Sequence, residues 1–123
     1  MTAQITIEDA DGRVVCDRCT VADRPLARLR GLLGRRELPA GEGLLLRPTP
    51  SIHTWFMRFP IDVVFLDRDW TVVRVVHALK PWRVAGARRA VAALELPAGT
   101  AAEARLEEGD VLVLEEPEAA GSD

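Results

Sequence analysis

The sequence predicts a mainly β protein, a compact β-sandwich or partly open barrel of about eight short strands with one or two short helices. Three observations support this prediction. Apolar and polar residues alternate in short runs, turn-forming residues separate these runs, and no long helical segment lies between the runs. Because a parallel doubly wound sheet needs helices between its strands, that architecture is disfavoured.

The length and composition are those of one folded domain. The chain has 123 residues, of which 48% are hydrophobic and 28% charged, and these values exclude a collagen-like or wholly disordered chain. We expect residues 1–114 to form a single mainly β domain. Residues 115–123 are acidic and poor in large apolar side chains, so we expect a disordered tail there.

The first third of the chain is predicted to form a hairpin followed by a helix. Residues Gln4–Glu8 alternate as a strand, Asp11 and the glycine after it are typical of a hairpin turn, and Arg13–Val21 supplies the partner strand. Leucines then recur at helical spacing after a capping aspartate. This spacing predicts a helix over about Arg24–Leu33.

The remaining residues are predicted to form strands joined by turns. The expected strands are Leu44–Arg47, Ser51–Met57, Ile61–Asp67, Thr71–Leu79, Ala90–Leu96 and Val111–Leu114. A turn at Asp67–Trp70 would make a long hairpin of two of them. Lys80–Gly86 is expected to be a loop, and Thr100–Leu106 a short helix.

Charge and hydropathy limit the partners that we expect. The formal net charge of −3 argues against general nucleic-acid binding, because such binding depends on neutralising phosphates. No apolar run approaches the roughly 18 to 20 residues that a membrane span needs. The first residues alternate and carry acidic side chains, unlike a secretory signal. We therefore expect a cytoplasmic monomer with no nucleic-acid partner, no membrane partner and no cofactor.

Two cysteines, Cys16 and Cys19, form a single C-x-x-C inside a predicted strand. A zinc ribbon needs a second pair, and His53 and His77 lie far from the cysteines and from each other in the sequence. Residues three apart on a regular strand also point to opposite faces. The two thiols are therefore weak candidates for a metal or redox site, and a structural role is favoured.

An aspartate, Asp62, lies within the apolar segment that runs from residue 51 to residue 66. Strand alternation puts it on the same face as Val64 and Leu66, either in the core or in the wall of a pocket. Since an unpaired buried charge is costly, it should accept backbone N–H bonds or pair with Arg58. The other interpretation is a ligand-binding or catalytic carboxylate.

In the same segment one histidine is followed, within residues 55–59, by four large apolar side chains. We expect His53 to be a satisfied polar residue and Phe56, Met57 and Phe59 to lie in the core. Trp55 is the exception, because it shares a face with His53 and could contact a ligand.

A second carboxylate, Glu95, also lies among apolar residues, and a pairing with arginine or backbone amides is the favoured interpretation. Earlier in the chain than Glu95, one predicted loop carries an aromatic ring and two cations, from Lys80, Trp82 and Arg83. That loop could bind an acidic group or a partner protein, although a solvated rim is also compatible with it.

Four motifs, in order, resemble the domain-of-unknown-function 192 family, also called uncharacterised protein family 0127. They are Arg30–Arg35, His53–Leu66, Leu94–Gly99 and Glu108–Asp110. The resemblance covers roughly residues 13–114. It implies a compact mainly β domain and a family without an established activity.

The central motif matches the family's pattern in part. The matching residues are Met57, Arg58, Pro60 and Asp62. The Asn-Thr pair that usually precedes the proline is absent, and Phe59 alone stands there. Trp70 stands where the family often has a turn glycine.

We expect a non-catalytic module that binds an unidentified small molecule or protein partner through the His53–Asp62 segment. The expected ligand-binding residues are Trp55, Arg58, Asp62, Lys80, Trp82 and Arg83. The alternative is a small hydrolase or isomerase in which Asp62 and Glu95 act as acid and base, with His53 or Arg58 stabilising charge. It requires both carboxyl groups within about 10 Å of each other in one pocket.

Overall fold

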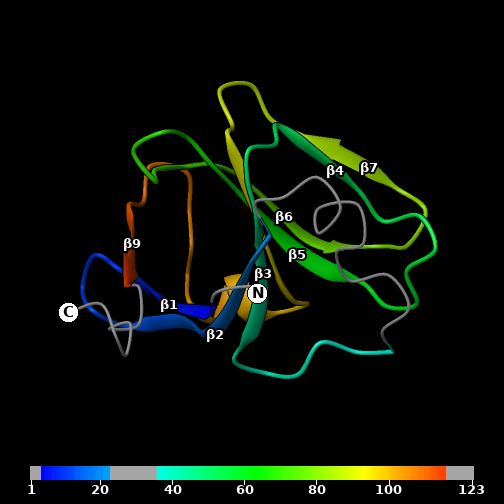
Figure 1. The fold of residues 1–123 in the computed structure, drawn as a ribbon, viewed down its shortest axis with the longest axis horizontal. Coiled ribbons are helices and arrows are strands. Elements are labelled where there is room, and N and C mark those ends of the chain that lie inside the picture. The colour runs from blue at the N-terminus through cyan, green and yellow to red at the C-terminus, as the bar shows by residue number, and fades with distance from the viewer. Residues whose placement is uncertain (1–3, 23–35, 116–123) are drawn as a thin grey trace.

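The computed structural model describes residues 4–22 and 36–115, which form nine strands and one short helix (Figure 1). The elements are β1 (Gln4–Asp9), β2 (Val14–Ala22), β3 (Glu42–Leu46), β4 (Ser51–His53), β5 (Ile61–Leu66), β6 (Val72–Leu79), β7 (Val84–Gly86), β8 (Ala92–Pro97), α2 (Thr100–Glu103) and β9 (Leu112–Glu115). The mainly β prediction is confirmed. Among the described residues, no helix is long and apolar enough to cross a membrane.

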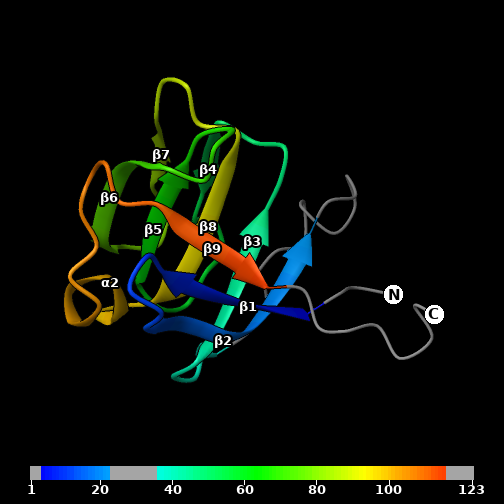
Figure 2. The ribbon, with the colours of Figure 1, turned by 90° about the vertical axis from the view of Figure 1, so that its left-hand side faces the viewer.

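Seven strands form one sheet in the order β6-β5-β8-β3-β2-β1-β9, and β4 pairs with β7 in a separate two-stranded sheet. Neighbours are antiparallel except β2 and β3, which run parallel. The large sheet curls so strongly that its two edge strands touch at one point (Figure 2). There Thr71, just before β6, and Val111, just before β9, form an isolated bridge. The result is a curled half-barrel.

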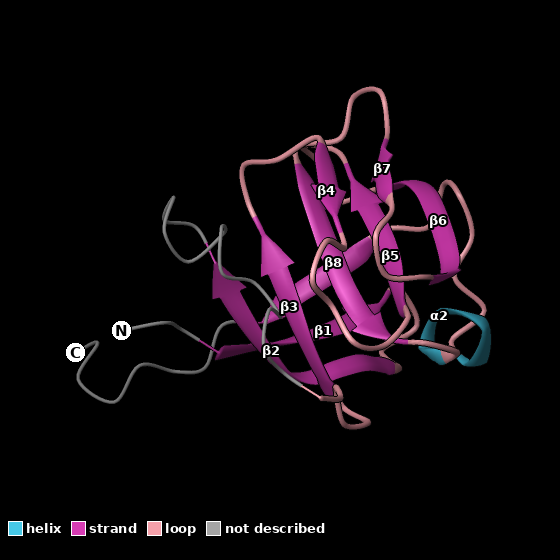
Figure 3. Cartoon of the chain, turned by 90° about the vertical axis from the view of Figure 1, so that its right-hand side faces the viewer, coloured by secondary structure: helices cyan, strands magenta, loops and turns pink. Residues whose placement is uncertain are grey.

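The two faces of the large sheet carry two separate hydrophobic clusters. All seven strands contribute to the inner cluster, for example Leu94 of β8 and Ile7 of β1. The outer cluster contains Phe65 of β5 and is covered by Ile52 of β4 and Met57 of the following loop, so the small sheet packs over this face (Figure 3). Because both faces of β5 are covered, all six of its residues are buried.

Two hairpin turns use the same aspartate device. Asp9 Oδ1 accepts N–H bonds from the residues two and four positions later at 2.8 and 2.9 Å, and Asp67 Oδ1 does so at 2.8 and 3.0 Å. The residue three positions after each aspartate has a positive φ, 87° at Gly12 and 63° at Trp70. Trp70 therefore holds a backbone conformation that favours glycine.

Most predicted elements are confirmed, with strand ends that differ by one or two residues and a last helix that ends earlier, at Glu103. Two predictions are wrong. The strand predicted over Ser51–Met57 ends at His53, because Thr54 bonds to another loop and the chain turns at Phe56. Within the predicted loop Lys80–Gly86, the last three residues form β7. The helix predicted over residues 24–33 and residues 116–123 of the predicted tail lie outside the described residues, whereas Glu115, the first residue of that tail, is the last residue of β9.

Candidate functional site

Asp62 is fully buried on β5, and its carboxylate is saturated by backbone N–H groups. Oδ1 accepts from Ala78 at 2.8 Å, and Oδ2 accepts from Gly99 at 3.0 Å and Ala101 at 2.9 Å. The carboxylate thus joins the end of β6 to the first turn of α2. Arg58 is exposed, and no ion pair within the described residues joins it to Asp62.

Glu95 lies on the opposite face of the same sheet. In the β5–β8 register Asp62 faces Leu96, whereas Val63 faces Glu95, so Asp62 points to the inner cluster and Glu95 to the outer one. The structure does not bring the two carboxyl groups into one pocket. Burial raises the pKa of Glu95 to about 8, so this side chain is mostly protonated at neutral pH.

The two cysteines share one face of β2, contrary to the expectation from regular alternation. Ile5 and Ile7 of β1 face Cys19 and Cys16, so the one residue between them on β1 opposes two residues of β2, and this irregularity turns both thiols into the inner cluster. The hydrogen bond between the two cysteine side chains lowers the pKa of Cys16 and raises the pKa of Cys19. Burial raises the pKa of Cys19 further. Among the described residues, no group of three or more His, Cys, Asp or Glu side chains could hold a metal ion.

Four large apolar side chains protrude beside β4 and β7. Trp55, Phe56, Trp82 and Val84 expose between 46% and 67% of their surface, and we call them the aromatic surface. The rings of Phe56 and Trp82 contact each other with centroids 4.6 Å apart, and Trp55 lies 4.8 Å from the ring of His53. Phe56 is therefore not a core residue, whereas Met57 is buried as predicted.

A buried threonine aligns the two loops that carry these aromatic side chains. The Thr54 hydroxyl donates to the Lys80 carbonyl oxygen at 2.6 Å and accepts the Arg83 N–H at 2.9 Å. Its backbone N–H donates to the Arg83 carbonyl at 2.8 Å, and its carbonyl accepts the Trp82 N–H at 2.9 Å. Sequence reasoning missed Thr54, because its partners lie 26 to 29 residues further along the chain.

Cations border the aromatic surface. Arg58, Lys80 and Arg83 are exposed on the two loops, and residues 51–61 and 80–89 contain no aspartate or glutamate. His53, also exposed, accepts the Trp55 N–H through Nδ1 at 3.3 Å. The structure thus brings together five of the six predicted ligand-binding residues on these two loops, whereas Asp62 is buried in β5.

The fold and the site define a small curled half-barrel domain with an exposed, cation-bordered aromatic surface. The DUF192 family model, described as Uncharacterized ACR, COG1430, matches residues 5–114. The chain therefore belongs to this family, whose function is uncharacterised.

Relatives in sequence and in structure agree with this assignment. The chain is 32% identical over 111 residues to UPF0127 protein TK1120 of Thermococcus kodakarensis, covering 86% of this chain and 70% of that protein. It is 40% identical over 67 residues to UPF0127 protein PH1112 of Pyrococcus horikoshii, which is 52% of this chain and 57% of that relative. A crystal structure from Sinorhizobium meliloti 1021, provisionally assigned as a transcription regulator, superposes with a TM-score of 0.79 at 24% identity, over 93% of this chain and 94% of that one. At that identity the likeness shows the fold alone.

Proposed function

We propose that this domain is a non-catalytic binding module whose aromatic surface docks an acidic segment of a partner protein. The observation that carries the proposal is the backbone conformation of the two central residues, whose aromatic side chains are exposed. Phe56 and Trp82 are both at φ 66° and both are more than half exposed. Large side chains in this left-handed region cost of order 1 kcal/mol or more each, and such strain concentrates at functional sites.

The shape of the surface favours a protein over a small molecule. Small-molecule sites are concave and bury most of the ligand, whereas these side chains protrude with much of their area open. Trp, Tyr and Arg dominate the binding energy of protein interfaces. The bordering cations Arg58, Lys80 and Arg83, with no acidic residue on either loop, favour a negatively charged partner segment.

The positions of the carboxyl groups also favour binding over paired-carboxylate catalysis. Both oxygens of Asp62 are occupied by backbone N–H groups, and Glu95 lies on the other face of the sheet. In our proposal Asp62 has a positioning role, since it fixes the end of β6 from which the loop with Trp82 departs.

Selection from a random peptide display library on the immobilised protein tests the proposal. The comparison variant is Phe56→Asn with Trp82→Asn, because asparagine tolerates positive φ and should keep the loops in place while removing both rings. We expect wild type to enrich peptides that combine Asp or Glu with aromatic or aliphatic residues. The variant should bind those peptides at least tenfold more weakly, and added salt should weaken binding to wild type.

Two controls make the selection decisive. Val14→Ser removes an apolar side chain of 55% exposure on β2, remote in sequence from both loops, and should bind selected peptides as wild type does. Unstructured single-stranded DNA is the second probe, since exposed aromatic rings and cations can also stack bases. Equal binding of peptides to the double-Asn variant, or tight binding of DNA without any peptide enrichment, would contradict the proposal.

A further inference from the structure

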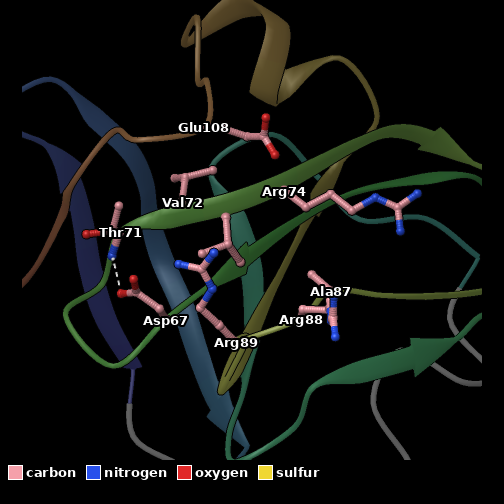
Figure 4. Close-up of a pocket in the computed structure, with 9 residues that line it drawn as sticks. Asp67, Thr71, Val72, Arg74, Ala87, Arg88, Arg89 and Glu108 are labelled. Atoms are coloured by element: carbon pink, nitrogen blue, oxygen red, sulfur yellow. Dashed lines mark hydrogen bonds between the residues drawn. The ribbon is translucent and has the colours of Figure 1, made fainter.

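An open pocket of about 560 Å³ lies away from the aromatic surface, between the start of β6 and the turn that joins β7 to β8 (Figure 4). Three arginines line it: Arg74 from β6, and Arg88 and Arg89 from the turn. Asp67 and Glu108 also line it; in Figure 4 the Asp67 carboxylate lies on the same side as Arg89, and the Arg74 side chain extends away from Arg89.

Arg89 is held in the pocket by a strained turn. The Ala90 N–H donates to the Ala87 carbonyl oxygen at 3.3 Å, so Arg88 and Arg89 are the two central residues of a β-turn. Arg89 has φ 68°, a conformation at this turn position that normally calls for glycine. A long charged side chain is therefore kept where glycine would satisfy the backbone better.

The guanidinium groups are available for a ligand. The Arg74 guanidinium is oriented by a hydrogen bond to the Gly86 carbonyl oxygen at 2.7 Å, which leaves its other N–H groups free of that bond. Within residues 4–22 and 36–115, no ion pair involves Arg74, Arg88 or Arg89. Asp67 Oδ1 is occupied by two backbone N–H groups of its own turn, so this carboxylate is already engaged.

We propose that this pocket binds a small molecule through an oxyanion, a phosphate or a carboxylate group, held by the Arg89 guanidinium, while Arg74 and Arg88 add positive charge to the lining. Arginine presents several N–H donors in a planar fork that matches the oxygens of both groups. The two carboxylates in the lining suit a hydrogen-bond donor or an ammonium group of the same molecule, and they disfavour a polyanion. The site shares no residue with the aromatic surface.

Titration of the ¹⁵N-labelled protein, followed by NMR, tests this site with inorganic phosphate and with acetate in separate arms. Sodium chloride at matched ionic strength is the reference. We expect saturable shifts of the Arg89 backbone amide and of the arginine Nε–Hε signals with at least one of the two anions. Saturation by phosphate alone identifies a phosphate group, by acetate alone a carboxylate, and by both a general oxyanion site.

The variant Arg89→Gly separates binding from folding. Because glycine adopts positive φ without strain, this variant should be as stable as wild type or more stable, yet bind the anion at least tenfold more weakly. Arg105→Gly is the matched control, since Arg105 is also an exposed arginine at positive φ (55°) but lies outside this pocket; it should bind as wild type.

Two results would overturn the anion site. One is the same set of shifts with chloride as with phosphate or acetate, and the other is unchanged anion affinity in Arg89→Gly. The double-Asn variant of the aromatic surface should retain anion binding, so failure of the peptide selection and failure of this site can be told apart.

Discussion

Six non-glycine residues have positive φ among the described residues, and three of them lie in the proposed sites. Phe56 and Trp82 form the aromatic surface, and Arg89 lies in the arginine-lined pocket. Trp70 is different, because it packs against the inner cluster and has Arg47 over its ring at 5.9 Å. At this scale, backbone strain is offset by packing at Trp70, and at Phe56, Trp82 and Arg89 we attribute its retention to ligand contact.

Glu95 makes stability depend on pH. Its pKa is about 8 in the folded protein and 4.5 in the unfolded chain, so the folded state binds more protons between these values. The stabilisation from this group is therefore complete below about pH 4.5 and is lost as pH rises toward 8. Relative to Glu95→Gln, wild type should lose about 1.4 kcal/mol per pH unit inside this window. Urea unfolding of both proteins from pH 5 to pH 9 measures the difference.

Asp62→Asn tests the other buried carboxylate, which the structure holds through backbone N–H groups. It removes an anionic acceptor from three backbone N–H groups, so it should lower the free energy of unfolding at pH 7 by about 2 to 4 kcal/mol.

For Glu95, parallel pH profiles of the free energy of unfolding in wild type and Glu95→Gln would show that the folded protein does not hold Glu95 in its neutral form.

At the scale of elements, β3 depends on a close approach between three strands. A Cβ added at Gly43 would lie 2.8 Å from Cys16 Sγ on β2 and 3.1 Å from the Glu95 carbonyl oxygen on β8. Neither neighbour is the free end of a flexible side chain, since Cys16 is fully buried. The absence of a side chain at Gly43 thus lets β3 pair with both strands at this level.

Gly43→Ala should therefore lower the free energy of unfolding by about 1 to 3 kcal/mol through overpacking. A double-mutant cycle with Cys16→Ala measures the contact, because removing the thiol should recover part of the loss. Strictly additive effects of the two substitutions would mean that the strain comes from β8 instead, where Leu96 Cδ2 also lies 3.1 Å from the added Cβ.

In the whole molecule, the seven-stranded sheet encloses the cluster that contains both thiols. The bridge between Thr71 and Val111 joins the sheet edges, and it is supported by the Leu112 N–H, which donates to the Trp70 carbonyl oxygen at 2.9 Å. Cys16 and Cys19 have no exposed surface in this arrangement. Reaction of either thiol therefore requires the curled sheet to open.

Thiol modification should report this opening. With a chromogenic disulfide reagent, wild type should react slowly without denaturant, and the rate should rise with urea in step with unfolding. The less stable Gly43→Ala should react faster in proportion to its lost stability. Rapid reaction of the native wild-type protein would instead indicate local opening at β1 and β2.

The sequence predicted those features that depend on neighbours along the chain. Period-two alternation and turn-forming residues indicated the mainly β class, both hairpins and the face that Asp62 shares with Val64 and Leu66. The apolar surroundings of Asp62 also indicated a partnered carboxylate, which the structure has. Alternation failed where the chain leaves a regular strand, as it does after His53.

Only the tertiary structure decided which groups come together. The partners of Asp62 lie 16, 37 and 39 residues away, and those of Thr54 lie 26 to 29 residues away, distances at which a sequence pattern carries no geometry. The irregular pairing of β1 with β2 put both cysteines on one face, and the β5–β8 register put Glu95 on the face opposite to Asp62. Strand periodicity is a local backbone property, whereas register, bulges and loop contacts depend on how distant segments pack.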